Sequence, residues 1–377
     1  MKKRDAGIWG TILLVILGIL SIIFGTDLIE ESGLNEDGSF GDNSGIPSQL
    51  PPISSDPLSQ DWYEIYFTDP VCAPEDQRFG GVDEIIAESF SEAEVRVDIA
   101  AFELNLESIV NALIDLEERG IEVRVVTDED NADESAINRL RRNGISVIED
   151  KRSALMHNKF AVIDGRYVWV GSMNFTTNGS YCNNNNMLIF DSPRLAANYT
   201  AEMDEMYNEQ QFGPDSPVNT PNEQLIIQGV EIENYFGPEK DIAPIIARTV
   251  ARAQESILFM AFSFTDERVG EAILGRADSG VVVQGVFETV GSETTFSYYP
   301  PMRDAGLPNL EVRQDGNGRI MHHKIIIVDF ETVIFGSFNF SENANRRNDE
   351  NVMIVKDTTF ANFFVEEFTA VWDEAAP

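Results

Sequence analysis

Two histidine–lysine pairs occupy equivalent places in the two halves of this 377-residue chain. Each is a His-x-Lys pair followed, after four residues, by an aspartate, and the copies are His157, Lys159 and Asp164, and His322, Lys324 and Asp329. Residues i and i+2 of an extended segment project to one side, so each histidine is expected beside its lysine. The third histidine, His323, has Asn158 at its equivalent position and is expected to point away and be structural.

A Gly-Ser-x-Asn motif follows each pair at the same distance. The serine comes 15 residues after the histidine in both copies, which places Ser172 with Asn174 and Ser337 with Asn339. Cations and neutral donors can hold the non-bridging oxygens of a phosphate while two histidines flank its phosphorus. The duplicated set therefore predicts a phosphodiester site, and it lacks the ligand spacing of a metal centre.

The elements that must position these motifs also occur twice. Strand-like runs that carry Ala-Phe are followed by a helix pattern and a second β-branched run, in the order Val95–Phe102 and Ile121–Val126, then Ile257–Phe264 and Val281–Phe287. Helices are expected at Asp83–Ala93, at Asp241–Ala253, from a cap at Asn105 to Gly120, and at Asp266–Ala277. The pattern predicts an α/β fold of two pseudo-symmetric halves, each a mostly parallel mixed sheet flanked by helices, with the active site between them.

The N-terminal part has a different composition. Residues 1–26 carry three cations before an uncharged apolar run that is long enough to cross a bilayer, which predicts a transmembrane anchor; a cleaved signal peptide is the alternative. Residues 27–60 are expected to be a disordered acidic linker. Residues 61–213 and 228–374 then form the two halves. The cations favour a single-pass topology with the catalytic domain on the extracytoplasmic side.

Charge and cysteine content limit the function. Asp and Glu number 64 against 27 Lys and Arg, a net charge of −37, which disfavours nucleic acid as a partner without excluding a local basic cleft. The two cysteines, Cys72 and Cys182, are too few for a disulfide framework, and the sequence leaves open whether they pair.

The motifs resemble those of the phospholipase D superfamily over about residues 61–374. The resemblance implies one histidine as nucleophile on phosphorus and the other as acid and base, with no metal or cofactor. It implies that the lysines, serines and motif asparagines bind phosphate oxygens. The motif aspartates, Asp164 and Asp329, would be mostly structural, holding the loop and the opposite half.

The same resemblance implies an acid or amide 28 residues after each histidine, where the chain has Asn185 and Glu350. Glu350 is expected to support His322, leaving Asn185 for His157. A carboxylate favours the protonated imidazole that an acid needs, so His157 is expected to be the nucleophile and His322 the acid and base.

The predicted activity is phospholipase D-type hydrolysis of phospholipid head-group esters at the membrane. The alternatives are an endonuclease that uses the same two histidines, a phosphatidyl transferase, and a non-enzymatic binding module, which the intact motifs disfavour. The sequence leaves the head group, the acceptor and the oligomeric state open.

Overall fold

The computed structural model describes Leu58 to Ala375. The predicted anchor and all but the last three residues of the predicted linker lie outside these residues. Those last three residues form strand β1 (Leu58–Gln60), so the linker prediction was wrong at its end. Within the described part, no helix is both long and apolar enough to cross a membrane.

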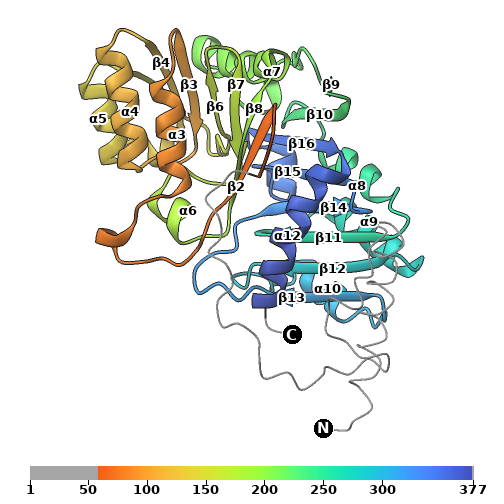
Figure 1. Ribbon diagram of the computed structural model, residues 1–377. Helices are drawn as coiled ribbons and strands as arrows, with labels where there is room; N and C mark the ends of the chain where they lie inside the picture. Colours follow the sequence, from red (N-terminus) through yellow and green to blue (C-terminus); the bar gives the residue numbers. More distant parts are fainter. Residues whose placement is uncertain (1–57, 376–377) are drawn as a thin grey trace. The chain divides into compact units, whose positions relative to one another are not determined.

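Two eight-stranded sheets form the frame (Figure 1). The first has the order β1-β2-β8-β7-β6-β3-β4-β5, with β2 (Tyr63–Phe67), β3 (Arg96–Ala101), β4 (Glu122–Asp128), β5 (Ser146–Asp150), β6 (Lys159–Ile163), β7 (Tyr167–Gly171) and β8 (Asn186–Asp191). The second has the order β13-β12-β11-β14-β15-β16-β10-β9, with β9 (Gln224–Ile227), β10 (Val230–Gly237), β11 (Ser256–Ala261), β12 (Val282–Phe287), β13 (Leu310–Gln314), β14 (Lys324–Val328), β15 (Thr332–Gly336) and β16 (Glu350–Lys356).

The prediction of an α/β fold in two similar halves is confirmed, but the sheets are not mostly parallel. In the first sheet only β3–β4 and β4–β5 pair in parallel, and the second sheet repeats this at β11–β12 and β12–β13. The sequence pattern captured these strand–helix–strand units correctly. The histidine motif and the Gly-Ser-x-Asn motif instead belong to antiparallel hairpins, β6–β7 and β14–β15, which need only a tight turn.

Helices cover both faces of the sheets. The first half contains α3 (Val82–Ser91), α4 (Glu107–Glu118), α5 (Ser135–Arg142), α6 (Thr177–Tyr181) and α7 (Pro193–Asp204). The second contains α8 (Ala243–Val250), α9 (Glu267–Asp278), α10 (Tyr299–Arg303), α11 (Glu342–Arg346) and α12 (Thr358–Glu374). Short helical turns lie at Glu75–Gln77, Glu129–Asn131, Glu205–Glu209 and Gly213–Asp215. Helix α9 begins where it was expected, with Asp266 as its N-cap. The prediction that Asn105 caps α4 was wrong, because Leu106 holds the N-cap position and Asn105 Oδ1 instead accepts the Thr177 N–H.

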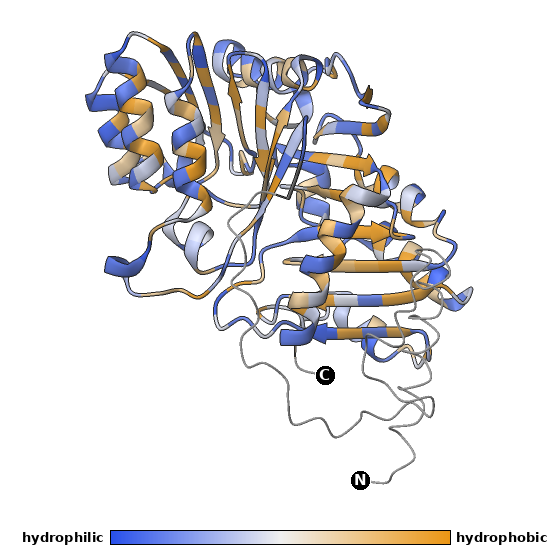
Figure 2. Cartoon of the chain, in the orientation of Figure 1, coloured by the Kyte–Doolittle hydropathy of each residue, from blue (hydrophilic) through white to orange (hydrophobic). Residues whose placement is uncertain are grey.

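Three apolar clusters pack the helices and the two sheets together in layers. One joins α3, α4 and α5 to one face of the first sheet, and another joins α8 and α9 to one face of the second. The third lies between the sheets, where Tyr199 of α7 and Phe364 of α12 pack with strands of both halves. The inner strands are accordingly mostly apolar, while α3, α4 and α5 carry both polar and apolar residues (Figure 2). This shared core fixes one half against the other.

A disulfide joins Cys72, in the loop after β2, to Cys182, at the end of α6. The bond links positions 110 residues apart within the first half. It ties the β2–α3 loop to the segment that leads to Asn185, which answers the question that the sequence left open.

Candidate active site

His157 and Lys159 lie at the start of β6 and are almost fully buried, with 6% and 0% of their surface exposed. The ring of Phe102, which follows β3, is 5.1 Å from the imidazole ring and 5.1 Å from Lys159 Nζ. Lys159 Nζ also donates to the carbonyl of His157 at 2.5 Å. One aromatic ring and one hydrogen bond thus hold the pair together, on the same side of the strand as alternation predicts.

His322 and Lys324 repeat this arrangement at the start of β14. Phe262 lies 4.7 Å from the imidazole ring and 4.7 Å from Lys324 Nζ, which donates to the carbonyl of His322 at 2.7 Å. Phe102 and Phe262 are the phenylalanines of the repeated Ala-Phe pairs. The repeat that the sequence showed in the strands therefore supplies the wall against which each His–Lys pair packs.

Each histidine is supported by the other half of the chain. Glu350 Oε2 lies 2.8 Å from His157 Nδ1, and Asn185 Oδ1 lies 2.9 Å from His322 Nδ1. The prediction that Glu350 supports His322 was therefore wrong. Backbone bridges explain the exchange, because the His157 N–H donates to the Asp349 carbonyl and the His322 N–H to the Asn184 carbonyl. In both rings Nδ1 is occupied, which leaves Nε2 for a substrate.

The two motif serines hold these supporting groups. Ser337 Oγ donates to Glu350 Oε2 at 2.7 Å, and Ser172 Oγ donates to Asn185 Oδ1 at 2.9 Å. Both hydroxyls also accept a backbone N–H from β16 or β8. Each serine hydroxyl thus donates its proton to the group that supports a histidine. Direct binding of phosphate by Ser172 and Ser337 stays a prediction.

The motif asparagines have unused hydrogen-bonding capacity. Asn174 and Asn339 each have a buried Oδ1 without a partner among the described residues. Asn174 Nδ2 donates to Glu103 Oε2 at 3.3 Å. Because the O and N of an amide can be exchanged by a flip, each side chain can present a donor to an anion.

The motif aspartates lie at the other end of the strand from the histidines. Asp164 accepts the backbone N–H groups of Glu94, Val95 and Arg96, and Asp329 accepts those of residues 254–256. Partial burial raises the pKa of Asp164, but the three N–H donors outweigh it and lower that pKa overall. These aspartates anchor the start of β3 and β11 in their own half. The structural role is as expected, but the expectation that these aspartates hold the opposite half was wrong.

Two acids that the sequence reasoning missed hold the histidine loops. Asp128 Oδ2 accepts the Met156 N–H at 2.8 Å, and Glu288 Oε2 accepts the Met321 N–H at 2.7 Å. Each acid stands at the carboxyl end of the second parallel strand of its half or directly after it, and this common position is the signal that could have found them.

The residue between each histidine and lysine is buried and structural. His323 Nε2 lies 2.8 Å from Glu367 Oε1 of α12, and Asn158 Nδ2 donates to Glu202 Oε1 of α7 at 3.2 Å. Both therefore tie the site to the two central helices, as expected for His323.

Burial shifts the pKa values of the ionisable groups of the site toward their neutral forms. Burial lowers the pKa of Lys159 to about 7, and burial together with the charge of Lys159 holds the pKa of Lys324 well below its usual value. Burial and the two ammonium groups likewise keep the pKa of His157 and His322 well below 6.5. Burial raises the pKa of Glu350 to about 8, against the opposing attraction of Lys159. The free site therefore favours neutral imidazoles and a bound anion.

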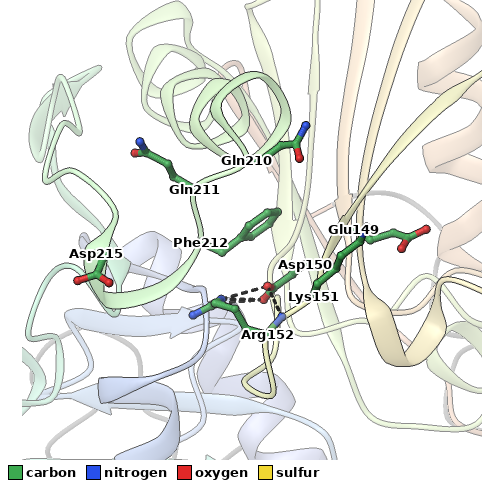
Figure 3. Close-up of a pocket in the computed structure, with 8 residues that line it drawn as sticks. All are labelled: Glu149, Asp150, Lys151, Arg152, Gln210, Gln211, Phe212 and Asp215. Atoms are coloured by element: carbon green, nitrogen blue, oxygen red, sulfur yellow. Dashed lines mark hydrogen bonds and ion pairs between the residues drawn. The ribbon is translucent and has the colours of Figure 1, made fainter.

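A hollow of about 450 Å³ lies beside the loop that leads to His157 (Figure 3). Arg152 meets Asp150 below the Phe212 ring and also pairs with Asp349, whose carbonyl accepts the His157 N–H. None of the predicted site residues lines this hollow. Among the described residues, no group of three or more His, Cys, Asp or Glu is arranged to hold a metal ion.

The family model described as "Cardiolipin synthase, PLD-like domain" matches this chain twice, at residues 86–207 and 246–372. Mitochondrial cardiolipin hydrolase from Chlamydomonas reinhardtii is 35% identical over 114 residues, which are 30% of this chain and 51% of that protein. Phospholipase D from Rickettsia felis is 30% identical over 138 residues, 37% of this chain and 68% of that protein. The matched part spans about half the length of the first curated relatives.

A solved structure shares the fold. Phosphatidylserine synthase from Haemophilus influenzae superposes with a TM-score of 0.62 at 14% identity, over 81% of this chain and 85% of that one. At this identity the likeness concerns the fold alone, and it covers both halves.

Proposed function

This chain belongs to the phospholipase D superfamily of phosphodiesterases, and from its site we propose that it hydrolyses the head-group ester of phospholipids through a phosphohistidine. The observation that carries the proposal is the pair of buried ammonium groups, Lys159 and Lys324, each packed beside a histidine of its own half. Two such charges oppose each other unless an anion lies between them. A phosphodiester supplies that charge and offers an oxygen to each half.

The reaction has two displacements. Nε2 of one imidazole attacks phosphorus, the bond from phosphorus to the head-group oxygen breaks, and that oxygen takes a proton from Nε2 of the other imidazole. The second imidazole then removes a proton from water, the resulting hydroxide attacks phosphorus, and the phosphorus–nitrogen bond breaks. The products are the free head-group alcohol and phosphatidic acid. Bound phosphate offsets the lysine charges, which lets the second imidazole carry its proton.

We assign the nucleophile to His157 for a reason that the observed partners supply. If a carboxylate partner marked the acid, the two histidines would exchange roles, because Glu350 lies on His157. A phosphorylated imidazole, however, is cationic for the whole lifetime of the intermediate, whereas the acid carries its charge only until it donates. The buried carboxylate compensates that longer-lived charge best beside the nucleophile. Asn185 suffices to fix the tautomer of His322.

Three features favour a lipid over nucleic acid. The net charge of −37 opposes approach to a polyanion. Two relatives are named mitochondrial cardiolipin hydrolase and phospholipase D. The cations of residues 2–4 and the apolar run after them support a membrane anchor, with the domain on the extracytoplasmic side. The disulfide supports that location, because such bonds persist in oxidising compartments.

The test is a side-by-side assay of the full chain in detergent. Head-group release from phospholipid is measured beside cleavage of single- and double-stranded DNA and RNA at physiological salt, with a His157→Ala chain as blank. We expect alcohol and phosphatidic acid from lipid, and negligible nucleic-acid cleavage. Efficient nuclease activity without lipid turnover would replace this proposal with the nuclease alternative. Transfer to added glycerol in preference to water would instead indicate a phosphatidyl transferase.

A further inference from the structure

Besides Glu350 and its counterpart Asn185, the two halves of the site differ at a second charged position. Glu103 follows Phe102 in the first half, and its equivalent in the second half, after Phe262, is Ser263. Glu103 is half-buried, and its Oε2 accepts from Nδ2 of Asn174, one of the predicted phosphate-binding amides. It also lies close enough to Lys159 to oppose the fall in the pKa of that ammonium. The carboxylate of Glu103 therefore lies beside the predicted phosphate-binding amide of the first half, and the second half has no carboxylate at the equivalent position.

Hydrogen bonds hold the backbone on both sides of Glu103. The Phe102 N–H donates to the Asn158 carbonyl at 3.2 Å, and the Phe102 carbonyl accepts from Asn131 Nδ2 at 2.8 Å. Leu104 forms a bridge with Phe175, directly after Asn174. The backbone of Glu103 thus lies between two hydrogen-bonded residues, Phe102 and Leu104, which keep it beside Asn174.

A fixed carboxylate beside a phosphate-binding amide weakens the binding of a bare phosphodiester by repulsion. It becomes favourable when the substrate brings a cation or a strong hydrogen-bond donor next to its phosphate. We propose that Glu103 is a specificity residue that selects phospholipids with an ammonium-bearing head group, such as ethanolamine, over head groups that lack a cation. This inference rests on the proposed function and names its substrate class. The phosphate takes the Asn174 amide, and the released carboxylate pairs with the ammonium.

The alternative to head-group selection is that Glu103 only offsets the charge of Lys159 and does not contact the head group. The two roles predict different kinetics. A group that acts on Lys159 alters turnover of every phosphodiester alike, whereas a group that binds the head group alters the ratio of kcat/KM between head groups.

The experiment compares phosphatidylethanolamine with phosphatidylglycerol of the same acyl chains. Each is diluted to low mole fraction in nonionic-detergent micelles, so that the charge of the surface stays constant. The wild-type chain is expected to favour phosphatidylethanolamine, and Glu103→Gln and Glu103→Ser are expected to reduce that kcat/KM ratio about fivefold, the size of a partly exposed ion pair. Glu118→Gln, an equal charge change at an exposed position of α4, should leave the ratio unchanged. Thermal melts of each variant show that it is folded.

An unchanged ratio in both Glu103 variants, or an equal loss on both lipids, would overturn the specificity role. Failure of the proposed function has a different signature: the wild-type chain would cleave bis(p-nitrophenyl) phosphate but neither lipid. Glu103 would then be tested with p-nitrophenyl phosphocholine against bis(p-nitrophenyl) phosphate. A ratio that Glu103→Gln leaves unchanged there would again reject the inference.

Discussion

Glu350 of the second half lies 2.8 Å from Nδ1 of His157 in the first half, and the carboxylate also accepts from Ser337. The imidazole that begins the first motif thus takes its charge partner from the far side of the interface. Asn185 does the same for His322 in the other direction. Each histidine is therefore supported by a residue of the other half, a carboxylate for His157 and an amide for His322.

The first prediction concerns their division of labour. His157→Ala should abolish turnover, because no attacking nitrogen remains. His322→Ala should still attack an ester with a good leaving group, such as bis(p-nitrophenyl) phosphate, because nitrophenolate departs without a proton. A stoichiometric burst and a phosphorylated residue 157 are expected by quench mass spectrometry. A phosphohistidine at 322 in the His157 variant, with none at 157 in the other, would reverse the assignment.

The second prediction concerns Asp164. Asp164→Ala leaves three backbone N–H groups without their acceptor and should lower the free energy of unfolding by about 2–3 kcal/mol. Since the pKa of Asp164 is lowered in the folded chain, its contribution is present above the unfolded pKa and is lost as the pH falls through the folded value. Urea unfolding at two pH values measures this. Turnover of the folded variant should change less than about threefold; a loss as large as that of Lys159→Ala would restore a catalytic role.

The third prediction concerns two neighbouring acids, one from each half, of which Glu205 is buried and Glu239 is half-buried. Burial raises the pKa of Glu205 to about 7 and that of Glu239 to about 8, with nearby acids adding to both shifts. Because these pKa values are higher in the folded chain, the protonated acids contribute their full stability below about pH 4.5. That contribution is lost as the pH rises through 7 to 8. We expect the free energy of unfolding to fall by several kcal/mol between pH 5 and 8.5, since a pKa difference of one unit corresponds to about 1.4 kcal/mol.

A double variant separates this effect from the general negative charge. Glu205→Gln with Glu239→Gln should flatten the pH dependence, whereas Glu231→Gln, exposed on β10, should not. A slope that the double variant leaves unchanged would assign the pH dependence to other groups.

The fourth prediction concerns the disulfide. Replacing Cys72 and Cys182 by serine removes a cross-link between positions 110 residues apart and should cost about 2–4 kcal/mol in unfolding free energy. Dithiothreitol should destabilise the natural chain by a similar amount and should not affect the double-serine chain. If the reductant destabilised both proteins equally, the loss of stability would not come from the disulfide.

The fifth prediction concerns metal ions. The proposed steps use only histidines, lysines and amides, so turnover of bis(p-nitrophenyl) phosphate should be unchanged in excess chelator. This soluble ester avoids any ion that a lipid surface itself binds. Loss of turnover that one added divalent ion restores would show that the chemistry needs a metal.

Sequence spacing predicted the features that depend on neighbouring residues. The side-by-side placement of His157 and Lys159 follows from strand alternation, and the equivalent pair at His322 follows from the repeat. Which half supports which histidine could not be predicted this way, because Asn185 and Glu350 reach their partners only across the interface. Their separation of 28 residues along the chain suggested the wrong partner.

The antiparallel majority of each sheet was missed for a related reason. Buried β-branched runs such as β6 and β14 have the same apolar pattern in parallel and antiparallel sheets, and only the short turns after Ile163 and Val328 distinguish them. Asp164 was expected to hold the opposite half, whereas its partners are residues 94–96 of its own half, at the far end of the strand from His157. A five-residue strand separates the two ends.

The exchange of partners has a genetic consequence. A substitution at Glu350 damages the histidine that is 193 residues away and spares the one that is 28 residues away. In a library of paired substitutions, epistasis should therefore link position 157 with 350 and position 322 with 185, and should be weak between 157 and 185. Second-site suppressors of a lesion in one motif are to be sought in the other half of the gene.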